Sequence, residues 1–223
     1  MNPLVSLAVH EVMARVAAPT PTPGGGAVAA ISGAFGTALT EMVASLPRTR
    51  RNAPEERVTL DQVRPALSAS RARLETLADL DSEAFDRVLR SNRLPQSTAA
   101  EQAARRVAIA EATKDATRVP LETARVCADV LALSETVAGA GNRAAMSDLL
   151  VAIGIVRAAA EGAAANVRAN LDTLDDEEFL RNSTAQLVAT LDDVMHSAHR
   201  AIGALQDQSA SGPDPQSLSR SLR

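Results

Sequence analysis

One apolar stripe in the second half of the sequence fixes its structural class. Between residues 143 and 172, apolar side chains recur at three- and four-residue steps, at Leu149, Ile153, Val156, Ala160, Ala163, Val167 and Leu171. This spacing returns to the same side of an α-helix at every turn, whereas a strand would alternate every second residue. The segment is therefore predicted to be one long helix.

The composition of the rest of the chain supports the same class. Ala, Leu, Arg and Glu dominate, and these residues favour helices. The aromatic residues, which favour strands, are limited to three phenylalanines, with no Trp or Tyr. A chain of 223 residues can bury about 70% of the surface of its unfolded form, so its core needs no metal or disulfide. We expect an all-α fold, an antiparallel bundle of about six long helices.

Helical segments are predicted at residues 4–16, 26–46, 55–90, 98–138, 143–172 and 175–206. Pro120 interrupts the fourth segment, where it should kink the helix or split it into 98–117 and 119–138. The segment 47–54 lies between two prolines and is predicted to be a loop. Residues 1–207 are expected to form a single domain, followed by a disordered polar tail at 208–223.

The predicted helix 26–46 has two different sides. A stripe of larger apolar residues comprises Val28, Ile31, Phe35, Leu39, Met42 and Leu46. The opposite side is small, with Ala27, Ala30, Gly33 and Ala34, and would let another helix approach closely. A bundle with long apolar stripes often buries one of them against a second copy, so these features leave both a monomer and a homodimer open.

Charge and cysteine content narrow the kinds of partner. The net charge is −4 and Lys114 is the single lysine, so the chain has no basic footprint for nucleic acid. Cys127 cannot form an intrachain disulfide and is expected to be a core residue. The N-terminal segment lacks the basic start and continuous apolar core of a signal peptide, and no apolar run approaches the roughly 20 residues of a membrane span. A soluble, cytoplasmic protein with a small-molecule substrate or a subunit partner is expected, without nucleic acid or membrane.

Three prolines and three glycines stand together in the stretch APTPTPGGGAVAA, residues 18–30. The prolines favour an extended approach, and Gly24, Gly25 and Gly26 permit a sharp turn with positive φ. The helix that follows offers free N–H groups and the positive end of its dipole. The stretch is either a cradle for an anion or carbonyl group, or a rigid turn that lets two helices pack.

Polar residues on the helix 143–172 form the second candidate site. Asp148 and Asn166 are eighteen residues apart, which is five helical turns, so they face the same side. Asn166 and Asn170 are one turn apart. A plain structural reading is that Asp148 stabilises a helix N-terminus and the asparagines bond across helices.

Other polar groups are weaker candidates. Asp79, Asp81, Glu83 and Asp86 are interpreted mainly as a solvated helix face. His196 and His199 lack a third ligand with the spacing of a zinc site. No metal site is predicted.

The stretch VAAPTPTPGGGAVAAISGAFGTALTEMVASL, followed in order by GNRAAMSDLLVA and ANVRANL, resembles the cyclodeaminase/cyclohydrolase family. The family comprises the cyclodeaminase domain of formimidoyltransferase-cyclodeaminase and free-standing methenyltetrahydrofolate cyclohydrolases, and the resemblance runs from about residue 5 to residue 180. It implies an all-helical homodimer that acts on a one-carbon unit carried by tetrahydrofolate, with a site that extends across the dimer interface.

The resemblance also assigns residues. It implies that Asp148 is the catalytic carboxylate, which transfers a proton in a buried position beside the pterin. Substrate-binding residues are expected at Pro23, Gly24, Gly25, Gly26, Arg50, Arg51, Ser147, Asn166 and Asn170. No cofactor is expected, since the tetrahydrofolate derivative is the substrate.

One loop departs from the family. The family usually has a Gly-Lys-Lys-Lys-Tyr/Phe run after the second helix, whereas this chain has LPRTRRNAPEE. Arg50 and Arg51 keep two cations that could hold the glutamate carboxylates of folate, but Asn52 and Ala53 replace the third cation and the aromatic residue. The predicted function is therefore a cyclodeaminase or cyclohydrolase of folate metabolism. Alternatives are an enzyme of the same fold with a non-folate imine or amidine substrate, and a non-catalytic helical dimer that binds a ligand or partner.

Overall fold

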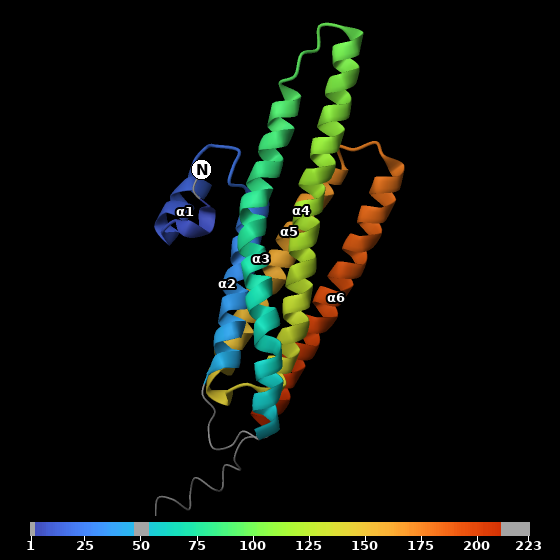
Figure 1. Ribbon diagram of the computed structural model, residues 1–223. Coiled ribbons are helices and arrows are strands. Elements are labelled where there is room, and N and C mark those ends of the chain that lie inside the picture. Colours follow the sequence, from blue (N-terminus) through green and yellow to red (C-terminus); the bar gives the residue numbers. More distant parts are fainter. Residues whose placement is uncertain (1–2, 47–53, 211–223) are drawn as a thin grey trace, which may run out of the picture.

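The computed structural model describes residues 3–46 and 54–210, and all regular structure in these two ranges is helical. Six α-helices follow one another, at Val9–Ala17 (α1), Gly25–Ser45 (α2), Pro54–Asn92 (α3), Ala99–Ala140 (α4), Met146–Leu171 (α5) and Glu177–Ala210 (α6). Two 3-10 turns lie at Leu4–Ser6 (η1) and Arg143–Ala145 (η2). The predicted all-α class is confirmed (Figure 1).

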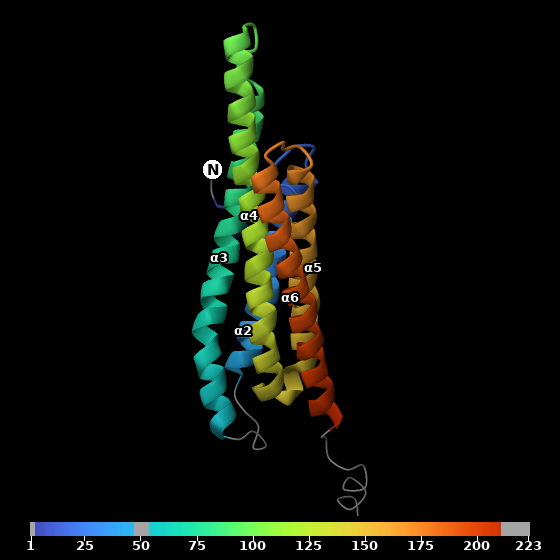
Figure 2. The same ribbon diagram turned by 90° about the vertical axis from the view of Figure 1, so that its right-hand side faces the viewer.

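The five long helices form an elongated bundle. Helix α2 packs against α3 and α5, and α4 packs against α3, α5 and α6. The hairpin of α3 and α4 extends beyond the other helices at one end (Figures 1 and 2). Helix α1 stands beside the bundle, next to α2, and none of its residues is buried.

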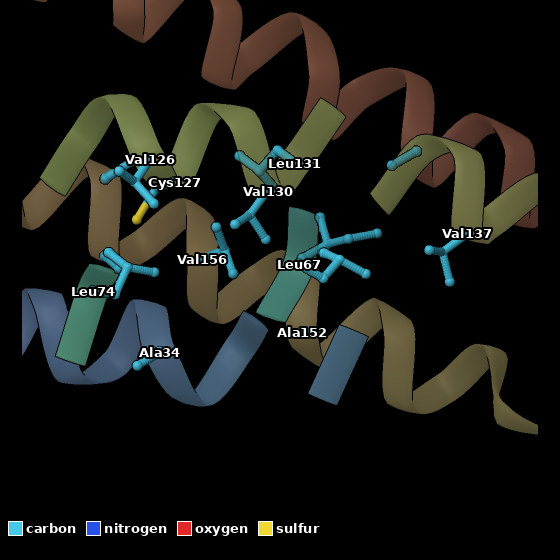
Figure 3. Packing of buried hydrophobic residues seen from close by; sticks show 14 of the residues in the cluster. Ala34, Leu67, Leu74, Val126, Cys127, Val130, Leu131, Val137, Ala152 and Val156 are labelled. Carbon is cyan, nitrogen blue, oxygen red and sulfur yellow. The ribbon is translucent and has the colours of Figure 1, made fainter. Parts of the chain in front are cut away.

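Aliphatic side chains from α2, α3, α4 and α5 fill the centre of the bundle (Figure 3). Leu67 and Leu74 of α3 meet Val130 of α4 and Val156 of α5 in this core. Cys127 is fully buried among them, and burial raises the pKa of its thiol to about 12. The prediction of Cys127 as a core residue is confirmed.

Two predicted segment boundaries are wrong, and one of the two alternatives at Pro120 is excluded. Residues 4–16 do not form one helix, because Leu7 is extended and the Glu11 carboxylate accepts the Ala8 N–H, which starts α1 anew. Helix α4 runs without a break through Pro120, which excludes the split into 98–117 and 119–138. Helix α6 reaches Ala210, three residues into the tail predicted as disordered, and residues 211–223 lie outside the described ranges.

The two sides of α2 face different surroundings. The small side is buried: a Cβ on Gly33 would lie 3.0 Å from Cys127 Sγ, and one on Gly36 would lie 3.0 Å from the carbonyl oxygen of Ala152. Adding even a methyl group here would therefore push α4 or α5 away. The prediction of close helix approach is confirmed, and it turns the larger apolar residues outward.

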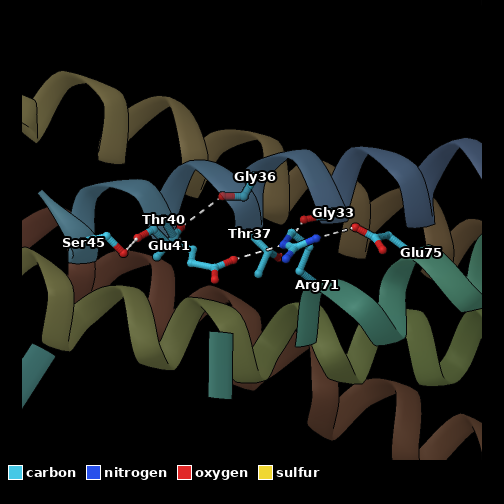
Figure 4. A network of polar contacts seen from close by, with 8 residues as sticks. All are labelled: Gly33, Gly36, Thr37, Thr40, Glu41, Ser45, Arg71 and Glu75. Atoms are coloured by element: carbon cyan, nitrogen blue, oxygen red, sulfur yellow. Dashed lines mark hydrogen bonds and ion pairs between the residues drawn. The ribbon is translucent and has the colours of Figure 1, made fainter. Parts of the chain in front are cut away.

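An ion pair fixes α2 against α3 on the outer side of the core. Arg71 of α3 donates from Nε to Glu41 Oε2 of α2 at 3.0 Å and from Nη1 to Glu75 Oε1 at 2.7 Å. The Thr37 and Thr40 hydroxyls, which are buried, donate to carbonyl oxygens one turn earlier in α2. Figure 4 shows this network along the two helices.

Two helical stretches, Gly25–Ser45 and Arg143–Leu171, have the length and hydropathy of a membrane span. The sequence-based expectation that no segment has this character is therefore too strong. In these two segments 56% and 44% of the most apolar window is buried inside the bundle. About half of each apolar window is therefore covered by other helices of the bundle. Core helices of soluble proteins have the same length and hydropathy.

The side chain of Asn170 explains how α4 passes through a proline. Pro120 has no N–H, so the carbonyl of Ala116, four residues earlier, loses its helical donor. Asn170 of α5 supplies a replacement, since its Nδ2 donates to the Ala116 oxygen at 2.8 Å. The interpretation that the asparagines bond across helices is confirmed for Asn170, whose bond lets α4 remain continuous, and is wrong for Asn166, which bonds within its own helix.

We predict that Asn170→Leu lowers the free energy of unfolding by about 1–3 kcal/mol, because it leaves the Ala116 carbonyl without a donor. In a Pro120→Ala background the helix supplies its own donor, so the same substitution should cost clearly less. Urea unfolding of the two single variants, the double variant and the parent measures this difference. Equal costs of Asn170→Leu in both backgrounds would contradict the explanation.

Candidate active site

The candidate active site lies at the amino end of α2, where the proline-glycine stretch joins α1 to the bundle. Residues 18–24 cross from α1 to α2, and Gly24 is the N-cap of α2 with no side chain to bond the first turn. The Thr22–Pro23 peptide is cis, and the Thr20 hydroxyl donates to the carbonyl of Thr22 at 3.1 Å. The stretch is thus a compact turn held by its own bonds.

The three glycines do not serve the purpose expected from the sequence. In the described ranges no glycine has a positive φ, and Gly24 itself is extended. The lack of a side chain is needed for close approach at Gly26, where a Cβ would meet the Asp81 carboxylate, whereas a Cβ on Gly25 would make an ordinary contact of 3.4 Å with Asn166 Nδ2. The expected positive φ is therefore wrong, and the glycine that the packing requires is Gly26, which leaves room for Asp81.

Asp81 reaches the first turn of α2 from α3. Its carboxylate accepts a hydrogen bond from the backbone N–H of Ala27. Burial raises the pKa of Asp81, and the bond from Ala27 partly opposes that rise. A half-buried carboxylate therefore sits at the positive end of the α2 dipole, where negative charge is stabilised.

Asn166 approaches the same turn from α5. Its Nδ2 donates to the carbonyl of Gly162 in its own helix at 2.9 Å, and its amide group lies against Gly25. Gly25 is exposed, whereas Gly26 is buried. Three elements far apart in the sequence thus converge here: the proline-glycine turn, α3 and α5.

The acidic run of α3 lines a cavity of about 590 Å³ beside this turn. Asp79, Ser82, Glu83 and Asp86 line it together with Pro23 and Arg15. Asp79 accepts the Leu4 N–H at 2.8 Å, and Asp86 accepts the Thr22 hydroxyl at 3.5 Å. Interpreting these acids mainly as a solvated face is wrong, because the N-terminal segment folds back over them.

Sequence reasoning missed Asp81, although its position carried a signal. It follows Leu60, Leu67 and Leu74 at seven-residue steps, and all three leucines are buried. Asp81 therefore continues the core-facing stripe of α3, and a carboxylate on a core stripe needs a partner. That register could have separated it from Glu83, which is exposed.

Asp148 and Ser147 lie far from this turn within one chain. Both are exposed in the first turn of α5, and eighteen residues along that helix separate Asp148 from Asn166, about 27 Å at 1.5 Å per residue. The connection before α5 contacts the other end of α2, where a Cβ on Gly141 would lie 3.4 Å from Val43. The expected burial of Asp148 is thus not found. Because α5 runs antiparallel to α2, its first turn lies at the end of the bundle opposite the glycine turn.

The remaining predicted site residues also fall at the two opposite ends of α2. Arg50 and Arg51 fall outside the described ranges, in the segment that joins the far end of α2 to α3. Asn170 lies beyond Asn166 at the near end and uses its Nδ2 on the Ala116 carbonyl. Within the described ranges, no three His, Cys, Asp or Glu side chains are grouped so that they could hold a metal ion.

Comparisons with known proteins agree with this architecture. A sequence model of the family described as formiminotransferase-cyclodeaminase matches residues 8–189. The methenyltetrahydrofolate cyclohydrolase of Methylorubrum extorquens is 42% identical over 183 residues, which cover 82% of this chain and 88% of that protein. The formimidoyltransferase-cyclodeaminase of Mus musculus is 33% identical over 198 residues, and the match covers 89% of this chain but 36% of that longer protein.

A solved structure has the same fold. The crystal structure of formiminotetrahydrofolate cyclodeaminase from Thermotoga maritima superimposes with a TM-score of 0.82 at 30% sequence identity, covering 92% of this chain and 99% of that one. The chain therefore belongs to the formiminotransferase-cyclodeaminase family. The resemblance found in the sequence motifs is confirmed.

Proposed function

We propose that the protein is a folate one-carbon enzyme that acts as a methenyltetrahydrofolate cyclohydrolase. The observation that carries this proposal is the 42% identity to a cyclohydrolase over 88% of that enzyme's length. The family match over residues 8–189 includes α2, α3 and α5, the elements that meet at the candidate site.

The reaction needs proton transfer at a single carbon. Water adds to the methenyl carbon between N5 and N10 and loses a proton to a base, which gives a tetrahedral hydroxyl adduct. The bond from this carbon to N5 then breaks, N5 takes up a proton, and the hydroxyl proton leaves as the formyl group forms. One proton is released overall and no oxidation state changes, so the proposal includes neither a redox cofactor nor a metal.

Cyclodeamination is the second candidate, because the chain superimposes along its length on the structure of a formiminotetrahydrofolate cyclodeaminase. There N10 attacks the formimidoyl carbon, its proton moves to the departing nitrogen, and ammonia leaves after one further protonation. Both reactions pass through a tetrahedral carbon and use one carboxylate as proton carrier. The same residues therefore serve either reaction.

An exposed apolar face supports the proposed homodimer. Val28, Phe35 and Met42 follow one side of α2 at seven-residue steps and are 37%, 56% and 37% exposed. Between α1 and α2 lies a groove of about 640 Å³ whose walls are largely aliphatic. Because the stripe runs the length of α2, a second copy in antiparallel orientation can cover it with the same residues, as a twofold interface requires.

This antiparallel arrangement also reconciles the two groups of predicted site residues. A twofold axis near Phe35, the middle of the stripe, sets the amino end of α2 in one protomer beside the carboxyl end of α2 in its partner. The turn at Gly24–Gly26 then meets the end of the partner that carries Asp148. We propose that Asp148 is the proton-transferring carboxylate and that Ser147, Arg50 and Arg51 bind substrate there, opposite Pro23 and Asn166.

Location and other partners remain predictions from the sequence. We propose a cytoplasmic enzyme with no nucleic-acid or membrane partner, supported by its net charge of −4 and its single lysine. A non-folate imine or amidine substrate is the alternative suggested by the altered loop 47–54. Turnover measurements with folates decide between a tetrahydrofolate substrate and a non-folate one.

The first prediction of the proposed function concerns the substrate. Purified protein should convert 5,10-methenyltetrahydrofolate, seen as loss of the absorbance of the methenyl group above the uncatalysed rate. Formimidoyltetrahydrofolate with an ammonia assay tests the second candidate. Conversion of neither folate would overturn the proposal and leave the non-folate substrate.

The second prediction concerns Asp148. Asp148→Asn should retain the helical circular dichroism spectrum but lower kcat at least about 100-fold, because the amide cannot carry the proton. Asp172→Asn, a change of an aspartate at the other end of α5, serves as the matched control and should leave kcat unchanged. Near-normal turnover in Asp148→Asn would rule out its catalytic role.

The third prediction concerns the interface. Phe35→Asp should give a monomer at micromolar concentration in sedimentation experiments, because it places a charge in the middle of the apolar stripe. Val107→Asp is the matched control, since Val107 is 64% exposed on α4, away from this face. A Phe35→Asp protein that sediments like the parent would contradict the proposed interface.

A further inference from the structure

The amino end of α2 has no cap of its own. Gly24 occupies the N-cap position and makes no side-chain bond, and no acidic residue lies in the first turn of α2. The first N–H groups of a helix need acceptors from elsewhere. In α2 one of these acceptors comes from another helix, since Asp81 of α3 accepts the Ala27 N–H.

We propose that Asp81 is a positioning residue of the candidate active site. Its carboxylate holds the first turn of α2 against α3, and it thereby sets the proline-glycine turn that meets the substrate. Gly26 is the residue that makes this contact possible. The inference rests on the proposed function, because it takes the turn at Gly24–Gly26 as the surface that binds the folate.

The absence of a side chain at Gly26 is explained by this contact. Gly26 has no positive φ, so it is not needed for backbone conformation. A Cβ there would lie 2.5 Å from Asp81 Cγ and 2.7 Å from Oδ2, far inside the distances that real Cβ atoms show. The three nearest atoms all belong to the Asp81 carboxyl group. An alanine at this position would therefore displace the carboxylate and break its bond to Ala27.

The contact is specific to Asp81 among the acids of α3. Asp79 bonds the Leu4 N–H and Asp86 the Thr22 hydroxyl, so both hold the segment before α2. Glu83 is exposed. Asp81 alone of these four lies on the core-facing register that continues Leu67 and Leu74, and it reaches the helix whose first turn carries the candidate site.

The electrostatics of Asp81 agree with a role in positioning the first turn of α2. Burial raises the pKa of Asp81, which means that its charge has been partly removed from water. The Ala27 N–H and the α2 dipole offset this cost. An asparagine keeps an oxygen that accepts the same bond, whereas an alanine does not, so Asp81→Asn should rescue what Asp81→Ala loses.

A double-mutant cycle tests the inference. Asp81→Ala and Gly26→Ala are each made alone and together, and KM and kcat for methenyltetrahydrofolate are measured with the thermal midpoint. Each single change should raise KM at least about 10-fold and leave kcat within about 2-fold, since binding rather than proton transfer is lost. Gly26→Ala should add less than about 2-fold in the Asp81→Ala background, because the clash is gone.

Two further variants sharpen the result. Asp81→Asn should keep KM within about 3-fold of the parent, as a retained acceptor requires. Asp129→Ala, a change of an exposed acid on α4 that lines neither cavity, should leave both constants unchanged. Effects of Asp81→Ala and Gly26→Ala on KM that are independent would overturn the inference.

Three other outcomes count against the inference or against its premise. Lower thermal midpoints with unchanged KM would show a merely structural contact. A large loss of kcat in Asp81→Asn would assign Asp81 to proton transfer instead. An unmodified protein that converts neither folate would overturn the proposed function, and this failure is distinguishable because the coupling of the two positions is also read in the thermal midpoint.

Discussion

The close approach of α2 to its neighbours is the constraint on which the other features depend. Gly33 and Gly36 let α4 and α5 lie so near that a methyl group would meet Cys127 or the backbone of α5. Such contacts tolerate little change, since protein interiors are packed as densely as organic crystals. With its small side buried, α2 must present Val28, Phe35 and Met42 outward. The same packing thus builds the core and leaves an apolar face exposed.

The direction of α2 also determines where chemistry can occur. Its amino end meets Asp81 from α3 and Asn166 from α5, while its carboxyl end lies near the start of α5 with Asp148. The length of the helix keeps these two ends about 30 Å apart within one chain. A single chain therefore separates the turn from the carboxylate expected to serve it. The proposed antiparallel dimer would join them, so the dimer is part of the proposed mechanism.

The helix periodicity predicted the fold class and the helix order, and the proline-glycine stretch together with the other motifs predicted the family. The finer features depended on contacts between distant segments. Asn170 compensates for Pro120 through a bond across 54 residues, so the continuity of α4 could not be predicted from local rules. The glycines were expected to allow positive φ, but Gly26 instead leaves room for Asp81, which arrives from another helix. The register of Asp81 with Leu60, Leu67 and Leu74 was visible in the sequence, although its partner was not.

The central claim is that one active site combines the turn of one protomer with Asp148 of its partner. Mixing subunits tests it most directly: Asp148→Asn and Gly25→Leu subunits, each inactive alone, are unfolded together, refolded and assayed with methenyltetrahydrofolate. Half of the dimers should then be mixed, each with one intact site of two, so activity should return to about a quarter of the parent. Activity no higher than that of either variant alone would contradict a site shared between protomers.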